Sequence, residues 1–174
     1  LLRRYANAVV AIDHTVAATL ETDLPLSIIH NGLQVTSSSV DERSGADGGP
    51  VRVGFLGVLI PLKGIFELVE AMRILKTRDV AIECLVAGEN ARQISGFKAW
   101  VLRRFGFARD VRAELEMLIR REGLEDRVKL LGFVSDVREL YPQLDILCFP
   151  SHLDAAGRPV FEAAFYSVPS VVAV

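Results

Sequence analysis

The segment VRVGFLG at residues 51–57 decides the fold class, together with GIFELVEAMRILKT at residues 64–77 and VAIECLVAG at residues 80–88. The first and third segments are short and almost wholly apolar, which is typical of buried parallel strands. In the second segment, apolar residues recur at helical spacing and share one face: Ile65, Leu68, Val69, Met72 and Leu75. A strand, a helix and a strand joined by short connections predict a parallel βαβ unit.

The same alternation continues to the last residue. A long helical region follows, with Gly123 at the position of a helix C-cap. The apolar stripe of that region consists of Val111, Leu115, Leu118 and Ile119. Further elements are predicted as a strand at 128–132, a short helix at 137–141, a strand at 144–149, a helix that opens at Pro159 and a strand at 170–174. The predicted fold class is therefore α/β, a Rossmann-like doubly wound parallel sheet.

Residues 36–50, TSSSVDERSGADGGP, are rich in Ser, Gly and Asp, and we interpret them as an exposed linker. We assign residues 1–35 to the end of a preceding domain and residues 51–174 to a second domain that is incomplete at its C-terminus. The piece before the linker is predicted to hold a strand at 8–12, a helix at 14–22 and a strand at 27–30. A β-hairpin, or an extra strand on the main sheet, is the alternative for that piece.

Composition and charge exclude several classes of protein. A net charge of −2 over 174 residues gives no reason to expect nucleic acid as a partner. No apolar run approaches the ~18–20 residues that cross a bilayer. Cys84 and Cys148 lie inside apolar runs, which favours core residues in a reducing, cytoplasmic compartment. The three histidines show no ligand spacing, so no metal is expected. The start LLRRYANAVVAID lacks Met and suggests an excerpt of a longer protein.

Ligands of open α/β sheets bind beyond the carboxyl ends of the strands, so the loops at those ends hold the candidate site residues. Gly57 ends the first strand, and Lys63 just before the next helix can meet a phosphate at the positive end of that helix. On its own a Lys-Gly pair is more often a solvated turn. The segment is neither a P-loop nor a dinucleotide fingerprint. Gly88 ends the second strand, where it permits close approach of backbone, in an ordinary turn or at a ligand.

The later strand ends add a second set of candidates. Phe133 and Val134 follow the third strand, where exposed backbone groups can read a flat base. Gly157 precedes the last helix and leaves its amides open to an anion. Glu162 is expected in the first turn of that helix, either serving the helix dipole or holding two vicinal sugar hydroxyls. The residues expected to point inward on the same helix are Phe161, Ala164 and Phe165.

Taken together, these loops resemble the donor-binding domain of family 4 glycosyltransferases, which have the GT-B fold. The resemblance rests on IIHNGLQV at 28–35, GFLGVLIPLKG at 54–64 and LVAGEN at 85–90. It rests most specifically on GLEDRVKLLGFVSDVRELYPQLDILCFPS at 123–151 and GRPVFEAAFYSVPSVVAV at 157–174. The resemblance implies retaining transfer of a glycosyl group from a nucleotide-diphosphate sugar, on one face of the sugar. Donor phosphate oxygens would act as the base, and no metal would be required.

The resemblance also implies roles for the residues at matching positions. Lys63 would contact the donor diphosphate, Phe133 and Val134 would border the base, and Glu162 would hold the ribose hydroxyls. Asp154 stands where the family usually has the first of two glutamates, and Gly157 matches a glycine whose backbone faces the sugar and phosphate. The site set, catalytic and donor-binding, is Gly57, Lys63, Gly88, Phe133, Val134, Asp154, Gly157, Arg158 and Glu162.

Two departures from the family pattern bear on activity. Val58 occupies the position of an arginine that normally pairs with the lysine on the diphosphate, and Arg158 is a candidate to compensate for it. The chain also stops short of the elements that normally close this domain, and it lacks nearly all of the N-terminal domain. The fragment is therefore expected to be inactive alone.

Residues 91–109, ARQISGFKAWVLRRFGFAR, are basic and aromatic. Such a segment suits peripheral contact with a membrane face beside a lipid-linked acceptor, and the alternative is a lid or helix packed on the missing domain. For the whole chain, two other functions stay open. One is a non-catalytic nucleotide-binding or interaction domain that kept the fold. The other is a different GT-B enzyme, such as a sugar-phosphate synthase or a phosphorylase. The acceptor is unknown, with a glycan and a lipid-linked acceptor both open.

Overall fold

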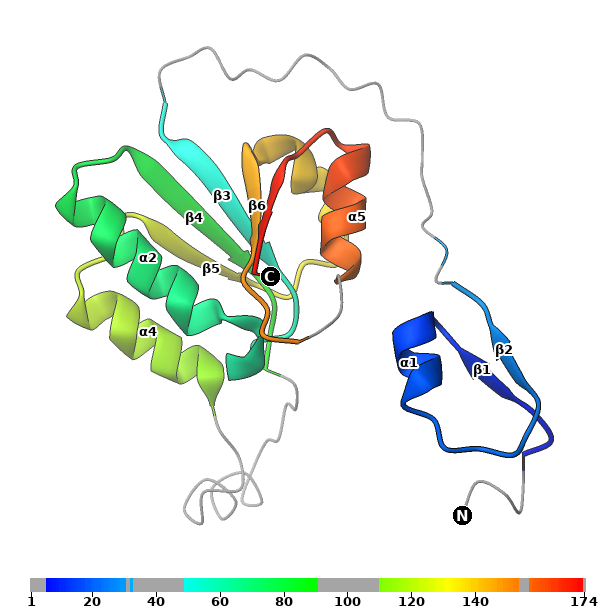
Figure 1. Ribbon diagram of the computed structural model, residues 1–174. Helices are drawn as coiled ribbons and strands as arrows, with labels where there is room; N and C mark the ends of the chain where they lie inside the picture. The colour runs from blue at the N-terminus through cyan, green and yellow to red at the C-terminus, as the bar shows by residue number, and fades with distance from the viewer. Residues whose placement is uncertain (1–5, 31, 33–48, 91–109, 154–156, 174) are drawn as a thin grey trace. The chain divides into compact units, whose positions relative to one another are not determined.

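The computed structural model describes residues 6–30, 32, 49–90, 110–153 and 157–173 (Figure 1). The chain divides into two compact units, Leu1–Ser38 and Ser39–Val174. The predicted linker, the segment 91–109 and Asp154 fall wholly or mostly outside the described residues.

The first unit is a strand, a helix and a strand. Strands β1 (Val9–Ala11) and β2 (Leu26–Ile28) are parallel, with Val9 opposite Leu26, and helix α1 (His14–Ala18) connects them. The parallel pairing excludes the β-hairpin, and the separate two-stranded sheet excludes an extra strand on the main sheet. Helix α1 ends at Ala18 rather than at the predicted residue 22, because the backbone N–H and the hydroxyl of Thr19 both donate to Val16 O and close the last turn.

The second unit is a parallel sheet with helices on both faces, as predicted. Its five strands stand in the order β5-β4-β3-β6-β7. In chain order the elements are β3 (Val51–Leu56), η2 (Pro61–Lys63), α2 (Ile65–Thr77), β4 (Ile82–Ala87), α4 (Val111–Arg121), β5 (Val128–Gly132), η3 (Val137–Glu139), η4 (Tyr141–Gln143), β6 (Ile146–Phe149), α5 (Arg158–Phe165) and β7 (Ser170–Val172).

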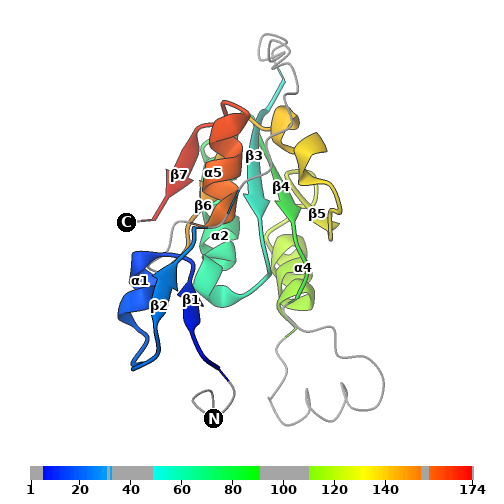
Figure 2. The ribbon, with the colours of Figure 1, turned by 90° about the vertical axis from the view of Figure 1, so that its right-hand side faces the viewer.

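Alternation along the strands divides the core between the two faces of the sheet. Val53 and Phe55 of β3 join the cluster under α2 and α4, whereas Leu56 joins the cluster under η4 and α5. Figure 2 shows α5 on the near side of the sheet and α2 behind it. The predicted stripes of α2 and α4 lie in the first cluster, with Leu75 and Leu118 partly buried at its edge. The apolar residues of β3, which recur at every second position, therefore pack against the apolar faces of α2 and α4, which recur every 3.6 residues.

Of two predicted details of the second unit, the glycine at the end of α4 is confirmed and the short helix at 137–141 differs in form. Gly123 lies one residue past the α4 cap at φ 61°, in the left-handed conformation that favours glycine there. The short helix expected at 137–141 is instead two 3₁₀ turns, η3 and η4. Pro142 lies in the second turn and lacks an amide hydrogen, so the hydrogen-bond ladder of η3 cannot run on through it.

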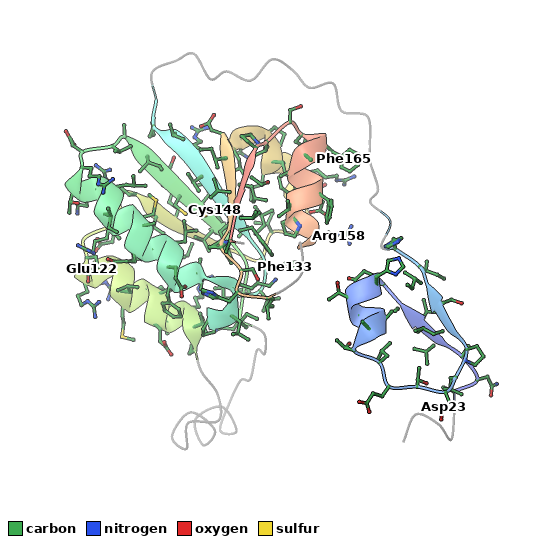
Figure 3. All side chains as sticks on the ribbon, viewed as in Figure 1. Asp23, Glu122, Phe133, Cys148, Arg158 and Phe165 are labelled. Carbon is green, nitrogen blue, oxygen red and sulfur yellow. The ribbon has the colours of Figure 1, made fainter. Side chains whose placement is uncertain are left out.

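The prediction for α5 was wrong about which residues point inward. Phe161 and Phe165 are 52% and 51% exposed, and Ala164 is exposed as well. Val160 and the fully buried Ala163 pack on the sheet instead. Phe165 lies near the end of α5 (Figure 3). Both sets of residues recur at helical spacing, so periodicity alone could not choose between the two faces.

Candidate functional site

The sheet has a topological switch point between β3 and β6. From β3 the chain moves outward through β4 to β5, and it then returns to place β6 on the other side of β3. Ligands of doubly wound sheets bind at the carboxyl ends of the strands at such a point. The loops that follow β3, β4, β5 and β6 meet there.

A pocket of about 440 Å³ opens at the carboxyl ends of β3, β4 and β5. It brings together four of the predicted donor-binding residues, Gly57, Gly88, Phe133 and Val134. The other residues that line it are Leu56, Val58, Ala87, Glu89, Asn90 and Val137. Phe133 is 77% exposed, so one face of its ring is available at the rim. Apolar side chains line most of this pocket, and such walls suit a flat aromatic ligand.

Two glycines set the floor of this pocket. Gly57 has φ 150°, which L side chains rarely adopt. A β-carbon on Gly88 would lie 1.8 Å from the carbonyl oxygen of Gly57. The close approach predicted at Gly88 is therefore present, and it is made to the neighbouring strand end. Backbone bonds from Gly57 N to Ala87 O and from Leu59 N to Glu89 O, each 2.9 Å, extend the pairing past the two strands.

Polar residues hold the far rim of the pocket. Glu89 Oε1 accepts from Arg112 Nη1 at 2.8 Å, and Asn90 Oδ1 accepts from the amide of Arg112 at 3.0 Å. The Asn90 amide in turn donates to Asp110 Oδ1 at 2.9 Å. Asp110 also caps α4 by accepting from Ala113 N. The end of β4 is thus tied to the start of α4, which gives the rim a defined shape.

Lys63 lies beside the pocket at the end of η2. Gly64, at φ 70°, turns the chain from η2 into α2. The Lys63 ammonium is 5.9 Å from the centre of the Phe149 ring, a cation–π distance. It would lie 2.9 Å from a β-carbon placed on Gly57. Burial lowers the pKa of Lys63 below its ordinary 10.5. A half-buried cation with a lowered pKa is favoured by a neighbouring anion, because the anion restores the charged form.

Phe149 joins Lys63 to the loop before α5. A β-carbon on Gly157 would lie 2.2 Å from the Phe149 ring, so the ring packs directly on the glycine. Gly157 is the N-cap of α5, and no side chain among the described residues caps that end. The Phe149 ring therefore lies near the Lys63 ammonium and also packs on Gly157 at the N-terminus of α5. Sequence reasoning did not single out Phe149, although an aromatic last residue of a switch-point strand was a usable signal.

A hydrogen bond and an ion pair hold the carboxylate of Glu162. The Tyr141 hydroxyl donates to Oε2 at 2.7 Å, and Arg158 Nε donates to Oε1 at 2.6 Å. Helix α5 begins at Arg158, so Glu162 lies beyond the first turn in which it was predicted. Glu162 is 20% exposed at its side chain. Arg158, the candidate to compensate for the arginine that Val58 displaces, is 61% exposed and pairs with Glu162 in this structure.

Val58 lines the pocket next to Gly57 and is 42% exposed. The position that would carry a cation in the family pattern thus presents an apolar side chain to the pocket. The family pattern has an arginine and a lysine at the diphosphate. In this chain the arginine position holds Val58, and the lysine, Lys63, lies beside Gly57.

The loop after β6 is tied to the start of α2. His152 N donates to Leu62 O at 2.9 Å, and His152 Nε2 lies 3.0 Å from Glu67 Oε1. The pKa of Glu67 is lowered, chiefly by a hydrogen bond from its own backbone amide and then by His152. Sequence reasoning missed this contact. It fixes the β6–α5 loop against the loop that carries Lys63.

No group of three or more His, Cys, Asp or Glu in the described ranges could hold a metal ion. Cys84 and Cys148 are free, and burial raises the pKa of Cys84 to about 12 and that of Cys148 as well, as fits core residues. Among the described helices, none has the length and apolar character needed to span a bilayer.

The fold and the site define a class: an α/β domain with a mostly apolar pocket at the carboxyl ends of β3, β4 and β5 of a parallel sheet. The chain belongs to the family of glycosyl transferases group 1, whose model matches residues 38–174. No curated protein sequence matches the chain.

Solved structures share the fold. HepE of Anabaena in complex with UDP and glucose superposes with a TM-score of 0.69 at 24% identity, covering 98% of this chain and 45% of its own. A TarM mutant of S. aureus, in complex with fondaparinux, alpha-GlcNAc-glycerol and UDP, superposes with a TM-score of 0.70 at 16% identity, covering 98% of this chain and 30% of its own. The C-terminal domain of the group 1 glycosyl transferase LpcC from Francisella tularensis superposes with a TM-score of 0.55 at 25% identity, covering 71% of this chain and 58% of its own. The sheet matches the C-terminal domains of GT-B glycosyltransferases, and the chain spans less than half of HepE or TarM.

Proposed function

We propose that this chain carries the donor-binding domain of a retaining, family 4 glycosyltransferase. In this proposal it binds a nucleotide-diphosphate sugar, and the whole protein transfers the glycosyl group to a glycan or a lipid-linked acceptor. One observation carries the proposal: an apolar pocket opens at the ends of β3, β4 and β5, and the half-buried Lys63 lies beside its floor at Gly57 and near the Phe149 ring, on which the N-cap of α5 packs. The apolar pocket suits a base, and the lysine and the helix N-terminus suit a diphosphate.

Each part of the donor has a place in this proposal. The base lies against Phe133 and Val134, above the floor formed by Gly57 and Gly88. The Glu162 carboxylate accepts hydrogen bonds from two ribose hydroxyls. Lys63 and the α5 N-terminus at Gly157 hold the diphosphate, and the negative charge that develops on it as the sugar leaves is stabilised there.

The retaining reaction is proposed to proceed on one face of the sugar. Donor phosphate oxygens take the proton of the acceptor hydroxyl, and no metal is required. Asp154, assigned beside the sugar, lies outside the described residues. Arg158 contributes by its pairing with Glu162.

Calorimetry with UDP, GDP and ADP and their glucose conjugates tests the binding step. UDP is the first choice, because HepE and TarM were solved with it. Proton NMR of the first product formed then reads the anomeric configuration: retention supports the proposal and inversion refutes it. Failure of every nucleotide to bind the folded full-length protein contradicts the donor site itself.

The rival function is a non-catalytic nucleotide-binding or interaction domain, and Val58 is the observation that favours it. An apolar side chain in the pocket wall supplies no positive charge that could stabilise the departing diphosphate. Nucleotide binding at micromolar affinity, together with the absence of any donor hydrolysis or transfer, supports this rival. Slow donor hydrolysis that depends on Lys63 supports the enzyme.

The domain assignment and location complete the proposal. Residues 1–35 belong to an acceptor-side domain, and the protein acts in the cytoplasm, at the inner face of the membrane if residues 91–109 bind it. Sedimentation of the full-length protein with anionic liposomes tests that contact. Trp100→Ala and Arg103→Glu are each expected to weaken it, and binding that neither substitution changes removes the membrane contact.

A further inference from the structure

Tyr141 lies beside the carboxylate of Glu162. It is fully buried, its ring stacks on that of Tyr166 with centres 5.2 Å apart and planes 13° apart, and its backbone belongs to η4. The hydroxyl is 2.7 Å from Glu162 Oε2 and 3.4 Å from the carbonyl oxygen of Pro159. A buried ring that is stacked on a neighbour has little freedom to turn.

The single proton of the Tyr141 hydroxyl goes to Glu162. The hydroxyl lies near two acceptors, and the carboxylate is both the closer and the stronger one. Burial raises the pKa of Tyr141, and the hydrogen bond to Glu162 raises it further. Tyr141 therefore remains a protonated donor throughout the physiological pH range, and Oε2 is always the oxygen that it holds.

The pairing with Arg158 is of a different kind. The Arg158 side chain is 61% exposed and lies four residues before Glu162 on the same helix. Such exposed pairs are weak and screened by salt. Arg158 can turn into solvent without leaving a buried polar group unpaired, whereas Tyr141 cannot. Of the two partners, Tyr141 sets the direction of the carboxylate.

The remaining acceptor positions of Glu162 match the proposed ligand. An ionised carboxylate offers about four lone-pair positions. Tyr141 and Arg158 use one each, which leaves two for the pair of vicinal hydroxyls of a ribose. If the Tyr141 bond is lost, the carboxylate can rotate and place its oxygens out of line with both hydroxyls.

We infer that Tyr141 is a positioning residue: its hydroxyl holds Glu162 Oε2 so that the carboxylate selects a ribose over a 2′-deoxyribose in the donor nucleotide. The inference rests on the proposed function of Glu162. Tyr141 itself touches no part of the donor in this arrangement and acts through Glu162 alone.

The test measures sugar discrimination in the full-length protein. Calorimetry gives the dissociation constants of UDP, GDP and ADP and of their 2′-deoxy forms. For the nucleotide that binds most tightly, the dissociation constant of the 2′-deoxy form is divided by that of the ribonucleotide to give the discrimination ratio. The wild-type ratio is expected to be about tenfold or more, from the loss of one hydrogen bond to a charged group. Tyr141→Phe keeps the ring stack and should lower the ratio to about threefold or less. Tyr166→Phe, which removes the hydroxyl of the stacked neighbour, is the matched control and should keep the wild-type ratio.

The outcomes separate the inference from the function on which it rests. If Glu162→Gln leaves the ratio unchanged, or no nucleotide binds, the proposed role of Glu162 fails. If Glu162→Gln lowers the ratio and Tyr141→Phe does not, the positioning role of Tyr141 fails alone. Thermal unfolding checks that each variant folds. If Tyr141→Phe does not fold, 3-fluorotyrosine at position 141 keeps the hydroxyl and makes it a stronger donor. A ratio altered from wild type then supports the inference, and an unaltered ratio overturns it.

Discussion

Replacing Val58 by arginine is expected to strengthen the binding of a nucleoside diphosphate. Val58 is 42% exposed and lines the pocket beside Gly57. A guanidinium at this position stays in contact with solvent, so the substitution costs little desolvation. If the diphosphate lies between the pocket and Lys63, the new cation lies within reach of it.

The expected gain in binding free energy is the difference between a new charged hydrogen bond and the repulsion from Lys63. A hydrogen bond to a charged group contributes about 1.5–3 kcal/mol, and solvent exposure at Val58 favours the lower end. Repulsion from Lys63 in the free protein subtracts little, since two like charges in water cost about 1 kcal/mol at about 4 Å and less at any larger separation. The net gain is about 1–1.5 kcal/mol, a roughly five- to tenfold lower dissociation constant.

Calorimetry with UDP at low and at high salt measures the effect of Val58→Arg, and uridine serves as the ligand without a diphosphate. The gain should shrink with salt and be absent for uridine. Leu62→Arg is the matched control, because it adds the same charge to the same loop at a residue that is 56% exposed and does not line the pocket. An equal gain from Leu62→Arg, or no gain from Val58→Arg, refutes the placement of the diphosphate beside Val58.

Three further predictions concern the residues around the pocket. Lys63→Met should weaken UDP binding about tenfold or more. The pKa of Lys63 is lowered from its ordinary 10.5, so the lysine loses its charge at a lower pH than a free lysine does. UDP binding by the wild type should therefore weaken as the pH rises toward 10.5. Lys63→Arg should abolish this weakening, because arginine keeps its charge. Gly157→Ala forces a β-carbon against the Phe149 ring and should lower the free energy of unfolding by about 1–3 kcal/mol in urea, whereas Gly49→Ala, with no atom within 4 Å of its β-carbon, should be nearly neutral. Phe133→Ala should weaken UDP binding by about 1 kcal/mol and leave the unfolding midpoint unchanged, since the ring is 77% exposed; equal affinity would place the base elsewhere.

The fold could be predicted from local patterns. The strands β3, β4 and β5 are short and mostly apolar, and the stripes of α2 and α4 recur at the helical period. The type of each element therefore follows from its own segment. Helix α5 shows where this reasoning stops. Its phenylalanines and its Val160–Ala163 pair both satisfy the period, and only the packing of Ala163 against the sheet decided between them.

The candidate site could be predicted only in part. The strand-end rule located Gly57, Gly88, Phe133 and Val134, and the structure brings all four to one pocket. The rule did not find Phe149 or Tyr141, because it considers only the loops beyond the strand ends, whereas Phe149 is the last residue within β6 and Tyr141 lies in η4 before that strand. Their roles arise from what they touch: Phe149 lies against Lys63 and Gly157, and Tyr141 against Glu162.

The α/β class, the order of the elements and the loops that carry the candidate ligands can be predicted from the chain alone, because these depend on patterns within a few turns of chain. Which of those loops meet depends on the tertiary structure. Placing β6 beside β3 brings His152 to Glu67 across 85 residues and the Phe149 ring to Lys63. Such contacts depend on the order of the strands in the sheet, which the pattern of any one segment does not contain.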